Sequence, residues 1–199
     1  MMGSPIAIVV LAAGSSSRLG QPKQLVQFNG QSLLQHVIGE SLKLENAVVV
    51  VVTGANREVT EKQIASPDIQ IVFNEHWKKG MGSSIACGLR KLMEISPKTA
   101  CCILAVTDQP FISAAIFREL IEEQAYSKKG IVASEYAQTF GTPALFSKKY
   151  FNRLRKLSGN EGAKKMFFDF ETDVSAIRFD QGIIDIDTPE DYEQLKKHP

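Results

Sequence analysis

The sequence has little cysteine and little histidine, three residues of each in 199, and this scarcity excludes several classes of protein. Two of the cysteines, Cys101 and Cys102, are neighbours, and an odd number of cysteines does not form a disulfide framework. So few cysteine and histidine side chains, scattered along the chain, also exclude a zinc cluster. The sequence therefore predicts a protein of a reducing compartment, which we expect to be the cytoplasm.

Long apolar runs and an excess of one charge are also absent. The longest apolar run, residues 6–13, is far shorter than the ~20 residues that span a bilayer, so we expect no membrane contact. Lys and Arg number 23 against 22 Asp and Glu, and the net charge of +1 argues against nucleic-acid binding. With 199 residues, 44% of them hydrophobic, we expect residues 1–199 to form a single domain.

Strand-like and helix-like segments alternate along the chain, which is typical of βαβ units. Apolar runs predict strands over 6–11, 47–53, 69–73, 100–106, 131–134, 144–146, 174–179 and 183–186. Helical periodicity predicts helices over 32–42, 58–65, 83–93, 113–126, 147–157 and 161–168, and a last helix opened by Pro189. We therefore predict a single-domain α/β fold, a mainly parallel Rossmann-like sheet flanked by helices. Ligands of such sheets bind at the carboxyl ends of the strands.

The loop after the first strand has the composition of a phosphate-binding loop. Residues 11–23 read Leu-Ala-Ala-Gly-Ser-Ser-Ser-Arg-Leu-Gly-Gln-Pro-Lys. Glycines and small residues leave backbone amides free for phosphate oxygens, and Arg18 and Lys23 add two cations. The spacing matches neither a Walker A loop nor the dinucleotide fingerprint, and a flexible surface loop is the alternative. We expect Lys23, as a cation of an exposed loop, to contribute little to folding.

Two serines follow the third strand, at the start of a predicted helix. Ser83 and Ser84 come after two glycines, Gly80 and Gly82, that free the backbone. Hydroxyl groups at this place can hydrogen-bond a base or a ribose, so we count both serines as nucleotide-binding candidates. The alternative is that they cap the helix.

Aspartates follow the fourth strand and the last predicted one. Asp108 lies one step beyond a buried strand, where a carboxylate is suited to Mg²⁺ that carries a nucleotide phosphate. Its alternative role is to cap the turn before Pro110. Asp185 and Asp187 alternate with isoleucines, so we expect them on one face of a short strand, from which one of them can reach the metal. The alternative is that they cap the C-terminal helix.

Five segments, taken together and in this order, resemble the nucleotidyltransferases of the molybdenum cofactor cytidylyltransferase type. They are residues 11–23, Thr-Asp-Gln-Pro at 107–110, Gly-Thr-Pro-Ala at 141–144, Gly-Asn-Glu-Gly-Ala-Lys at 159–164 and Asp-Ile-Asp-Thr-Pro-Glu-Asp at 185–191. The resemblance spans almost the whole chain. It implies a fold of the nucleotide-diphospho-sugar transferase type and a Mg²⁺-dependent transfer of CMP from CTP to the terminal phosphate of molybdopterin, or of its molybdenum-loaded form, with release of pyrophosphate.

The resemblance also implies roles for particular residues. The backbone of Leu11, Ala12, Ala13 and Gly14 would hold the cytosine and the ribose. Arg18 and Lys23 would grip the triphosphate and act with Asp108 as the catalytic residues, and Mg²⁺ would be held by Asp108 and Asp187. The residues facing the pterin would be Gly141, Thr142, Pro143, Gly162 and Lys164.

Several positions bear on the choice of substrates. Guanylyl-transferring relatives usually have Gly and Asp in place of Ala13 and Pro22, so these two residues favour CTP. Thr142, Asn160 and Lys164 stand where many family members have His, Asp and Arg, and all three lie in the acceptor region. A sugar-phosphate or polyol-phosphate acceptor is therefore an alternative. A second alternative is a non-catalytic carrier that loads the cofactor into a molybdenum hydroxylase.

Overall fold

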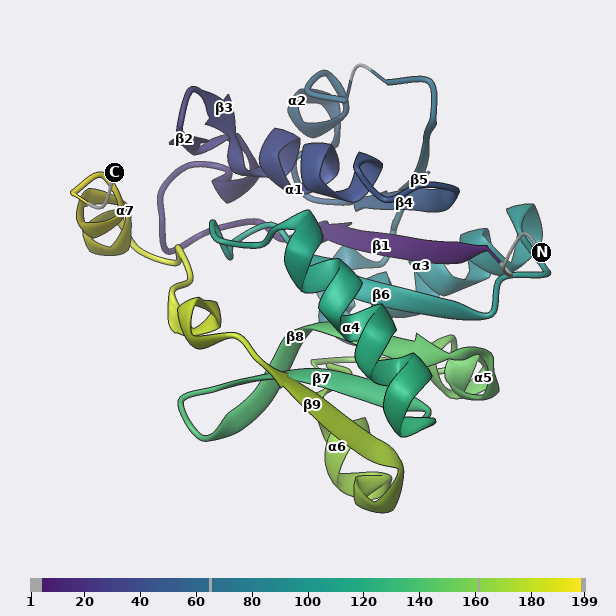
Figure 1. Cartoon of the computed structure of the whole chain (residues 1–199). Coiled ribbons are helices and arrows are strands. Elements are labelled where there is room, and N and C mark those ends of the chain that lie inside the picture. The colour runs from purple at the N-terminus through teal and green to yellow at the C-terminus, as the bar shows by residue number, and fades with distance from the viewer. Residues whose placement is uncertain (1–4, 65, 161, 198–199) are drawn as a thin grey trace.

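One mixed sheet runs through the middle of the protein (Figure 1). The computed structural model describes residues 5–64, 66–160 and 162–197, and within them seven strands pair in the order β5-β4-β1-β6-β8-β7-β9. The only antiparallel pairs among them are those of β8 with β6 and β7, so the prediction of a mainly parallel sheet is confirmed. The strands are β1 (Ile6–Ala12), β4 (Ala47–Thr53), β5 (Ile69–Phe73), β6 (Cys101–Val106), β7 (Ile131–Tyr136), β8 (Thr139–Ser147) and β9 (Val174–Arg178).

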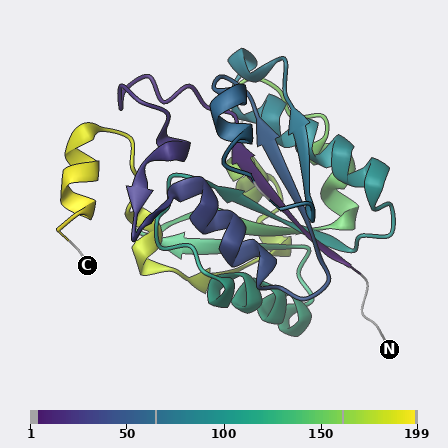
Figure 2. The ribbon, with the colours of Figure 1, turned by 90° about the horizontal axis from the view of Figure 1, so that it is seen from above.

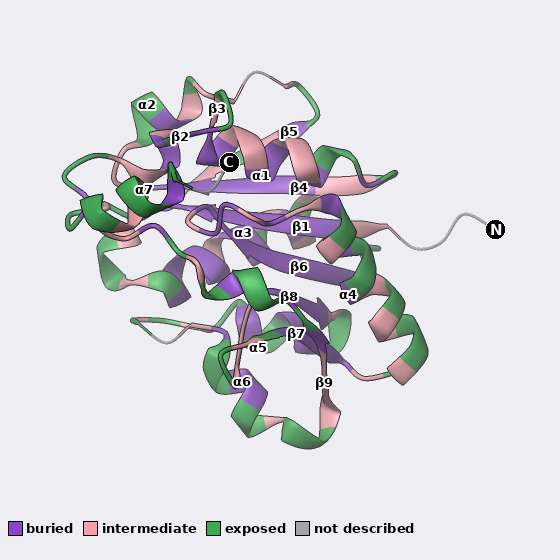
Figure 3. Cartoon of the chain, turned by 60° about the vertical axis from the view of Figure 1, so that its left-hand side comes forward, coloured by how far each residue is buried: buried purple, intermediate pink, exposed green. Residues whose placement is uncertain are grey.

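Helices cover both faces of the sheet, which explains why the central strands are continuous apolar runs. On one face lie α1 (Leu33–Leu42) and α4 (Ala114–Ser127), whose Val37 and Phe117 share a core cluster with Ile8 of β1. On the other face lie α3 (Met81–Ile95), α5 (Phe151–Leu154) and α6 (Lys164–Asp169). Figure 3 shows buried strands between helices whose outer sides are exposed. No helix in the described ranges is long and apolar enough to cross a membrane.

A small third cluster ties the C-terminal segment to the loop after β1. It joins the hairpin of β2 (Gln27–Phe28) and β3 (Gln31–Ser32) to α7 (Pro189–Leu195), which lies beside that hairpin in Figure 2. Ile186 is completely buried in this cluster, together with Leu19 and Leu195. The cluster therefore holds residues 186–188 next to the loop that follows β1.

The predicted strand over 183–186 is wrong, and with it the expectation that Asp185 and Asp187 share one face of a strand. The segment is a 3-10 turn, η5 (Asp180–Ile183), followed by an extended stretch outside the sheet. A backbone hydrogen bond from the Ile186 amide to the Asp108 carbonyl, at 2.9 Å, joins this stretch to the segment after β6. The alternation of polar and apolar residues over 183–186 therefore does not reflect pairing in a β-sheet. It arises because Ile186 is buried in the small cluster.

Three predicted helices are shorter than expected. The region 147–157 breaks into a 3-10 turn, η3 (Lys148–Tyr150), and the single turn of α5. The helix predicted over 161–168 begins at Lys164, and its first predicted residue, Glu161, lies outside the described residues. The helix predicted over 58–65 is α2 (Arg57–Glu61), and Ala65 likewise lies outside them.

Candidate active site

Four charged side chains meet where β1 and β6 end. Lys23 opens a 3-10 turn, η1 (Lys23–Leu25), and its Nζ lies 2.6 Å from Oδ2 of Asp108 and 2.8 Å from Oδ1 of Asp187. Arg18 donates from Nη2 to the other oxygen of Asp187, at 2.5 Å. The structure thus brings together the two cations of the loop and the two aspartates, which are up to 169 positions apart in the sequence.

Lys23 is the centre of this cluster. Burial disfavours its charge, but the carboxylates of Asp108 and Asp187 outweigh burial and raise the pKa of Lys23 above its ordinary value. The hydrogen bond from Lys23 is the main reason why the pKa of Asp187 is lowered. The Lys23 side chain is only 17% exposed, so the expectation that this lysine is exposed is wrong. Arg18, at 71%, is the exposed member.

Side-chain hydrogen bonds fix the loop after β1 in a conformation that leaves several of its backbone amides without a hydrogen-bond acceptor among the described residues. The buried Gln24 side chain donates from Nε2 to the carbonyls of Ala12 and Gly14, both at 3.0 Å, and the Lys23 amide donates to Oγ of Ser16 at 2.9 Å. Within the described chain, the backbone amides of residues 14–17 donate no hydrogen bond. Free successive amides are what a phosphate-binding loop needs. The sequence reasoning did not identify Gln24, which directly follows the loop's lysine.

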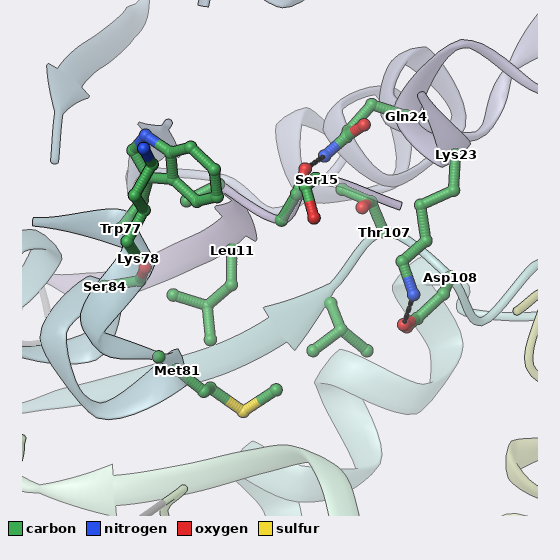
Figure 4. Close-up of a pocket in the computed structure, with 14 residues that line it drawn as sticks. Leu11, Ser15, Lys23, Gln24, Trp77, Lys78, Met81, Ser84, Thr107 and Asp108 are labelled. Atoms are coloured by element: carbon green, nitrogen blue, oxygen red, sulfur yellow. Dashed lines mark hydrogen bonds and ion pairs between the residues drawn. The ribbon is translucent and has the colours of Figure 1, made fainter. Parts of the chain in front are cut away.

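A cleft of about 350 Å³ opens beside this cluster (Figure 4). It lies between the ends of β1 and β6 and the turn η2 (Trp77–Lys79) that leads into α3. Its volume is in the range of small-ligand sites. The lining residues are Leu11, Ala13, Gly14, Ser15, Lys23, Gln24, Trp77, Lys78, Gly80, Met81, Ser84, Val106, Thr107 and Asp108.

Of the two predicted serines, Ser84 lines this cleft and Ser83 does not. The Ser83 hydroxyl can donate to the carbonyl of His76 at 2.9 Å or of Gly80 at 2.8 Å. The Asn74 side chain donates from Nδ2 to both serine hydroxyls, at 2.9 and 3.0 Å. Ser83 therefore organises the turn before α3, which is a structural role.

A second cleft, of about 290 Å³, adjoins the first. The two clefts share a wall made of Met81, Val106 and Asp108. The remaining lining residues of the second cleft are Gln109, Tyr136, Ala137, Thr139, Thr142, Gly182, Ile183 and Asp185. None of these described residues is a lysine or an arginine.

A hydrogen-bond network shapes the second cleft. Thr142 donates from its hydroxyl to Oε1 of Gln109 at 3.2 Å, and Nε2 of Gln109 donates to the Gly182 carbonyl at 2.7 Å. A Cβ at Gly141 would lie 2.0 Å from the Tyr136 hydroxyl oxygen, so a larger residue there would require the Tyr136 side chain to move. Burial, and after it the charges of Asp108 and Asp187, raise the pKa of Asp185. Gln109 and Tyr136 were missed by the sequence reasoning.

Of the five residues expected to face the acceptor, Thr142 alone is among the described lining residues of this cleft. Gly141 and Pro143 flank it in β8. Gly162 lies near Met81, because a Cβ on it would be 3.3 Å from the Met81 sulfur. Lys164 is exposed at the start of α6 and lines neither cleft.

The cysteines offer no nucleophile for this site. All three are free, and Cys101 and Cys102 are buried in β6. Burial raises the pKa of Cys101 to about 11, so its thiol stays protonated at neutral pH.

Comparison with known proteins identifies the class. Residues 8–174 match the MobA-like NTP transferase domain, so the chain belongs to that family and is a nucleotidyltransferase by family and fold. It is 29% identical to the purine catabolism protein PucB of Bacillus subtilis (strain 168), over 98% of both chains. It is 23% identical to the molybdenum cofactor cytidylyltransferase of Escherichia coli (strain K12), over 98% of this chain and 97% of that one.

A solved structure has the same fold over the full chain. Rv0371c of Mycobacterium tuberculosis H37Rv superposes with a TM-score of 0.86 at 27% identity, covering 99% of this chain and 100% of that one. A complex of that mycobacterial protein with manganese matches with a TM-score of 0.80 at 24% identity, covering 98% of this chain and 99% of that one.

Proposed function

We propose that the protein transfers CMP from CTP to the terminal phosphate of molybdopterin, or of its molybdenum-loaded form, and releases pyrophosphate. The observation that carries the proposal is the wall shared by the two clefts. Asp108 in this wall lines both clefts, and Lys23 forms an ion pair with Asp108. A nucleotide in the first cleft and an acceptor in the second would meet at this wall. The similarity to a molybdenum cofactor cytidylyltransferase supports the choice of substrates.

In the proposed reaction, an oxygen of the acceptor phosphate attacks the α-phosphorus of CTP. The bond from the α-phosphorus to the bridging oxygen breaks, and pyrophosphate leaves with the electron pair. Lys23 and the free amides of residues 14–17 would neutralise the triphosphate, with Arg18 at the outer edge. Positioning and charge neutralisation suffice for such a transfer, and it requires no protein nucleophile.

Asp108 and Asp187 fit a Mg²⁺ ion. Both present hard carboxylate oxygens to one point, the Lys23 ammonium. In the described chain no group of three or more metal-binding side chains occurs, and Mg²⁺ is commonly held by one or two carboxylates with substrate phosphates and water. When bound, the ion would neutralise charge on the triphosphate. Lys23 would then be free to contact phosphate oxygens.

We further propose that the catalytic domain extends over residues 1–199. The family match ends at residue 174, but Asp187 contacts Lys23 from beyond that end. We place the reaction in the cytoplasm, in keeping with three free thiols. The product would be delivered to a molybdenum hydroxylase.

The lining of the second cleft favours a heterocyclic acceptor over a sugar phosphate or polyol phosphate. Tyr136, Ile183 and Met81 offer apolar surface, and Gln109 and Thr142 offer hydrogen bonds. The cleft has no cation of its own among the described residues, so an acceptor phosphate would depend on Lys23 and Mg²⁺ at the shared wall. A flat, weakly charged ring system suits such a lining.

Pyrophosphate release tests the proposal. The protein is incubated with Mg²⁺ and CTP, and molybdopterin, a sugar phosphate or a polyol phosphate is added in parallel. We expect release with molybdopterin only, and a kcat/KM for CTP roughly tens to hundreds of times that for GTP. If pyrophosphate is released only with the sugar phosphate or the polyol phosphate, that compound is the acceptor and molybdopterin is not. No release with any acceptor, from folded protein that binds CTP, would favour the non-catalytic carrier.

A further inference from the structure

The two ends of the first cleft differ: one carries an ion pair, and the other carries aromatic and thioether surface with the Lys78 ammonium beside it. Lys23 and Asp108 line one end, Trp77 and Met81 line the other, and Leu11 lies between them (Figure 4). A nucleoside triphosphate also has two different ends, because its phosphates carry the charge and its base is flat and weakly polar. The flat indole surface favours the orientation in which the base lies at the Trp77 end and the phosphates lie toward Lys23.

Trp77 is firmly placed at that end. Its amide donates to the Asn74 carbonyl at 3.1 Å, and its carbonyl accepts from the Gly80 amide at 3.0 Å. The Asn74 side chain, which is buried, also bonds the hydroxyls of Ser83 and Ser84 at the start of α3. The indole is half-buried against the core that α3 covers, and the rest of it lines the cleft.

We propose that Trp77 is the residue on which the nucleotide base packs, an inference that rests on the proposed nucleotidyl transfer. An indole loses little conformational freedom on binding and presents a flat π-face to a base. The ammonium of Lys78, another lining residue, is 5.6 Å from the centroid of the indole ring. This ammonium lies over one face of the indole, so a base that packs on that face would take its place, and the remaining indole surface lines the cleft.

This role gives affinity without choosing between bases, because every base has a π-face. Replacement of Trp77 by alanine is therefore expected to weaken CTP and GTP binding by the same factor, about 5- to 100-fold. The affinity for tripolyphosphate, which has the charges and no base, is expected to stay unchanged. Trp77→Phe keeps an aromatic ring and is expected to lose much less than Trp77→Ala.

Trp77 is the only tryptophan of the chain, so the tryptophan emission reports this one place. The full chain is titrated with CTP and, in parallel, with tripolyphosphate, both with Mg²⁺. We expect CTP to change the emission and tripolyphosphate to leave it nearly unchanged. Calorimetry then gives the Kd values of CTP, GTP and tripolyphosphate for the unmutated protein, Trp77→Ala and Trp77→Phe, and thermal melts monitor folding.

The outcomes separate this inference from the function on which it rests. Suppose that calorimetry shows CTP binding, that CTP does not change the tryptophan emission of the unmutated protein, and that Trp77→Ala binds CTP with the same Kd as the unmutated protein. The role of Trp77 is then refuted, and the proposed nucleotidyl transfer stands. Equal losses for CTP and tripolyphosphate would mean that Trp77 only supports the turn, which also refutes the proposal. If no nucleotide binds the unmutated protein, the proposed function itself fails.

Discussion

Lys23→Met removes the ammonium that Asp108 and Asp187 share and keeps a side chain of similar length. The two ion pairs, at 2.6 and 2.8 Å, join side chains that are 17–25% exposed. Breaking a buried pair typically costs about 3–5 kcal/mol and an exposed pair about 0–1 kcal/mol. This partly buried cluster lies between those cases, so we expect a loss of about 2 kcal/mol. For a chain of this size that corresponds to a fall in Tm of roughly 4–8 °C.

Thermal melts at neutral pH measure the loss, and Arg18→Met is the matched control. Arg18 contacts the same Asp187, but its side chain is 71% exposed, so its removal is expected to cost at most about 1 kcal/mol. Mg²⁺ is expected to stabilise Lys23→Met more than the unmutated protein, because the two carboxylates then lack a counter-ion. If Lys23→Met melts no lower than Arg18→Met, the reasoning from burial is refuted.

Three further predictions concern other residues. Asp108→Asn is expected to abolish nucleotidyl transfer while the far-UV CD spectrum stays unchanged, and near-normal turnover would exclude Asp108 as a metal ligand. Gly80→Ala is expected to cost about 2–4 kcal/mol in denaturant unfolding, since Gly80 has φ +99° and a Cβ there would lie 2.5 Å from the Gly159 carbonyl oxygen; an unchanged midpoint would contradict this. Burial acts to raise the pKa of Asp173, but the Lys149 ammonium lowers this pKa below 3.8. The unmutated protein is therefore expected to be more stable than Asp173→Asn above about pH 4, and this difference should decline as the pH falls through the pKa of Asp173 in the folded protein. A difference in Tm that does not depend on pH would refute this.

The buried strands could be predicted from the sequence because their physics is local. A strand covered on both faces is expected to be apolar, and β1 and β6 are apolar at every position, while β4 is apolar up to its last residue, Thr53. The strand predicted over 183–186 is wrong because the burial there depends on long-range contacts. Ile186 is buried by α7 and the loop after β1, and a long-range contact of this kind leaves no periodic signal in the sequence.

The charged part of the site could also be foreseen, because strand ends of a parallel sheet meet at one edge. Arg18, Lys23 and Asp108, which follow β1 and β6, do lie together, whereas Asp187 reaches them from a stretch outside the sheet. Trp77 could not be foreseen, since a lone aromatic after a strand is as common in a core as in a cleft. Gln109 and Tyr136 depend on the antiparallel β8 crossing beside β6, and this crossing follows from tertiary packing alone.

The most direct measurement uses CTP labelled at the α-phosphate, with Mg²⁺ and molybdopterin. We expect the label to move into a pterin product that has gained one CMP, with one unlabelled pyrophosphate released per transfer. Asp108→Asn should give neither product. Label recovered only as unchanged CTP, or as free CMP with no modified pterin, in the presence of folded and nucleotide-bound protein would contradict the proposed transfer.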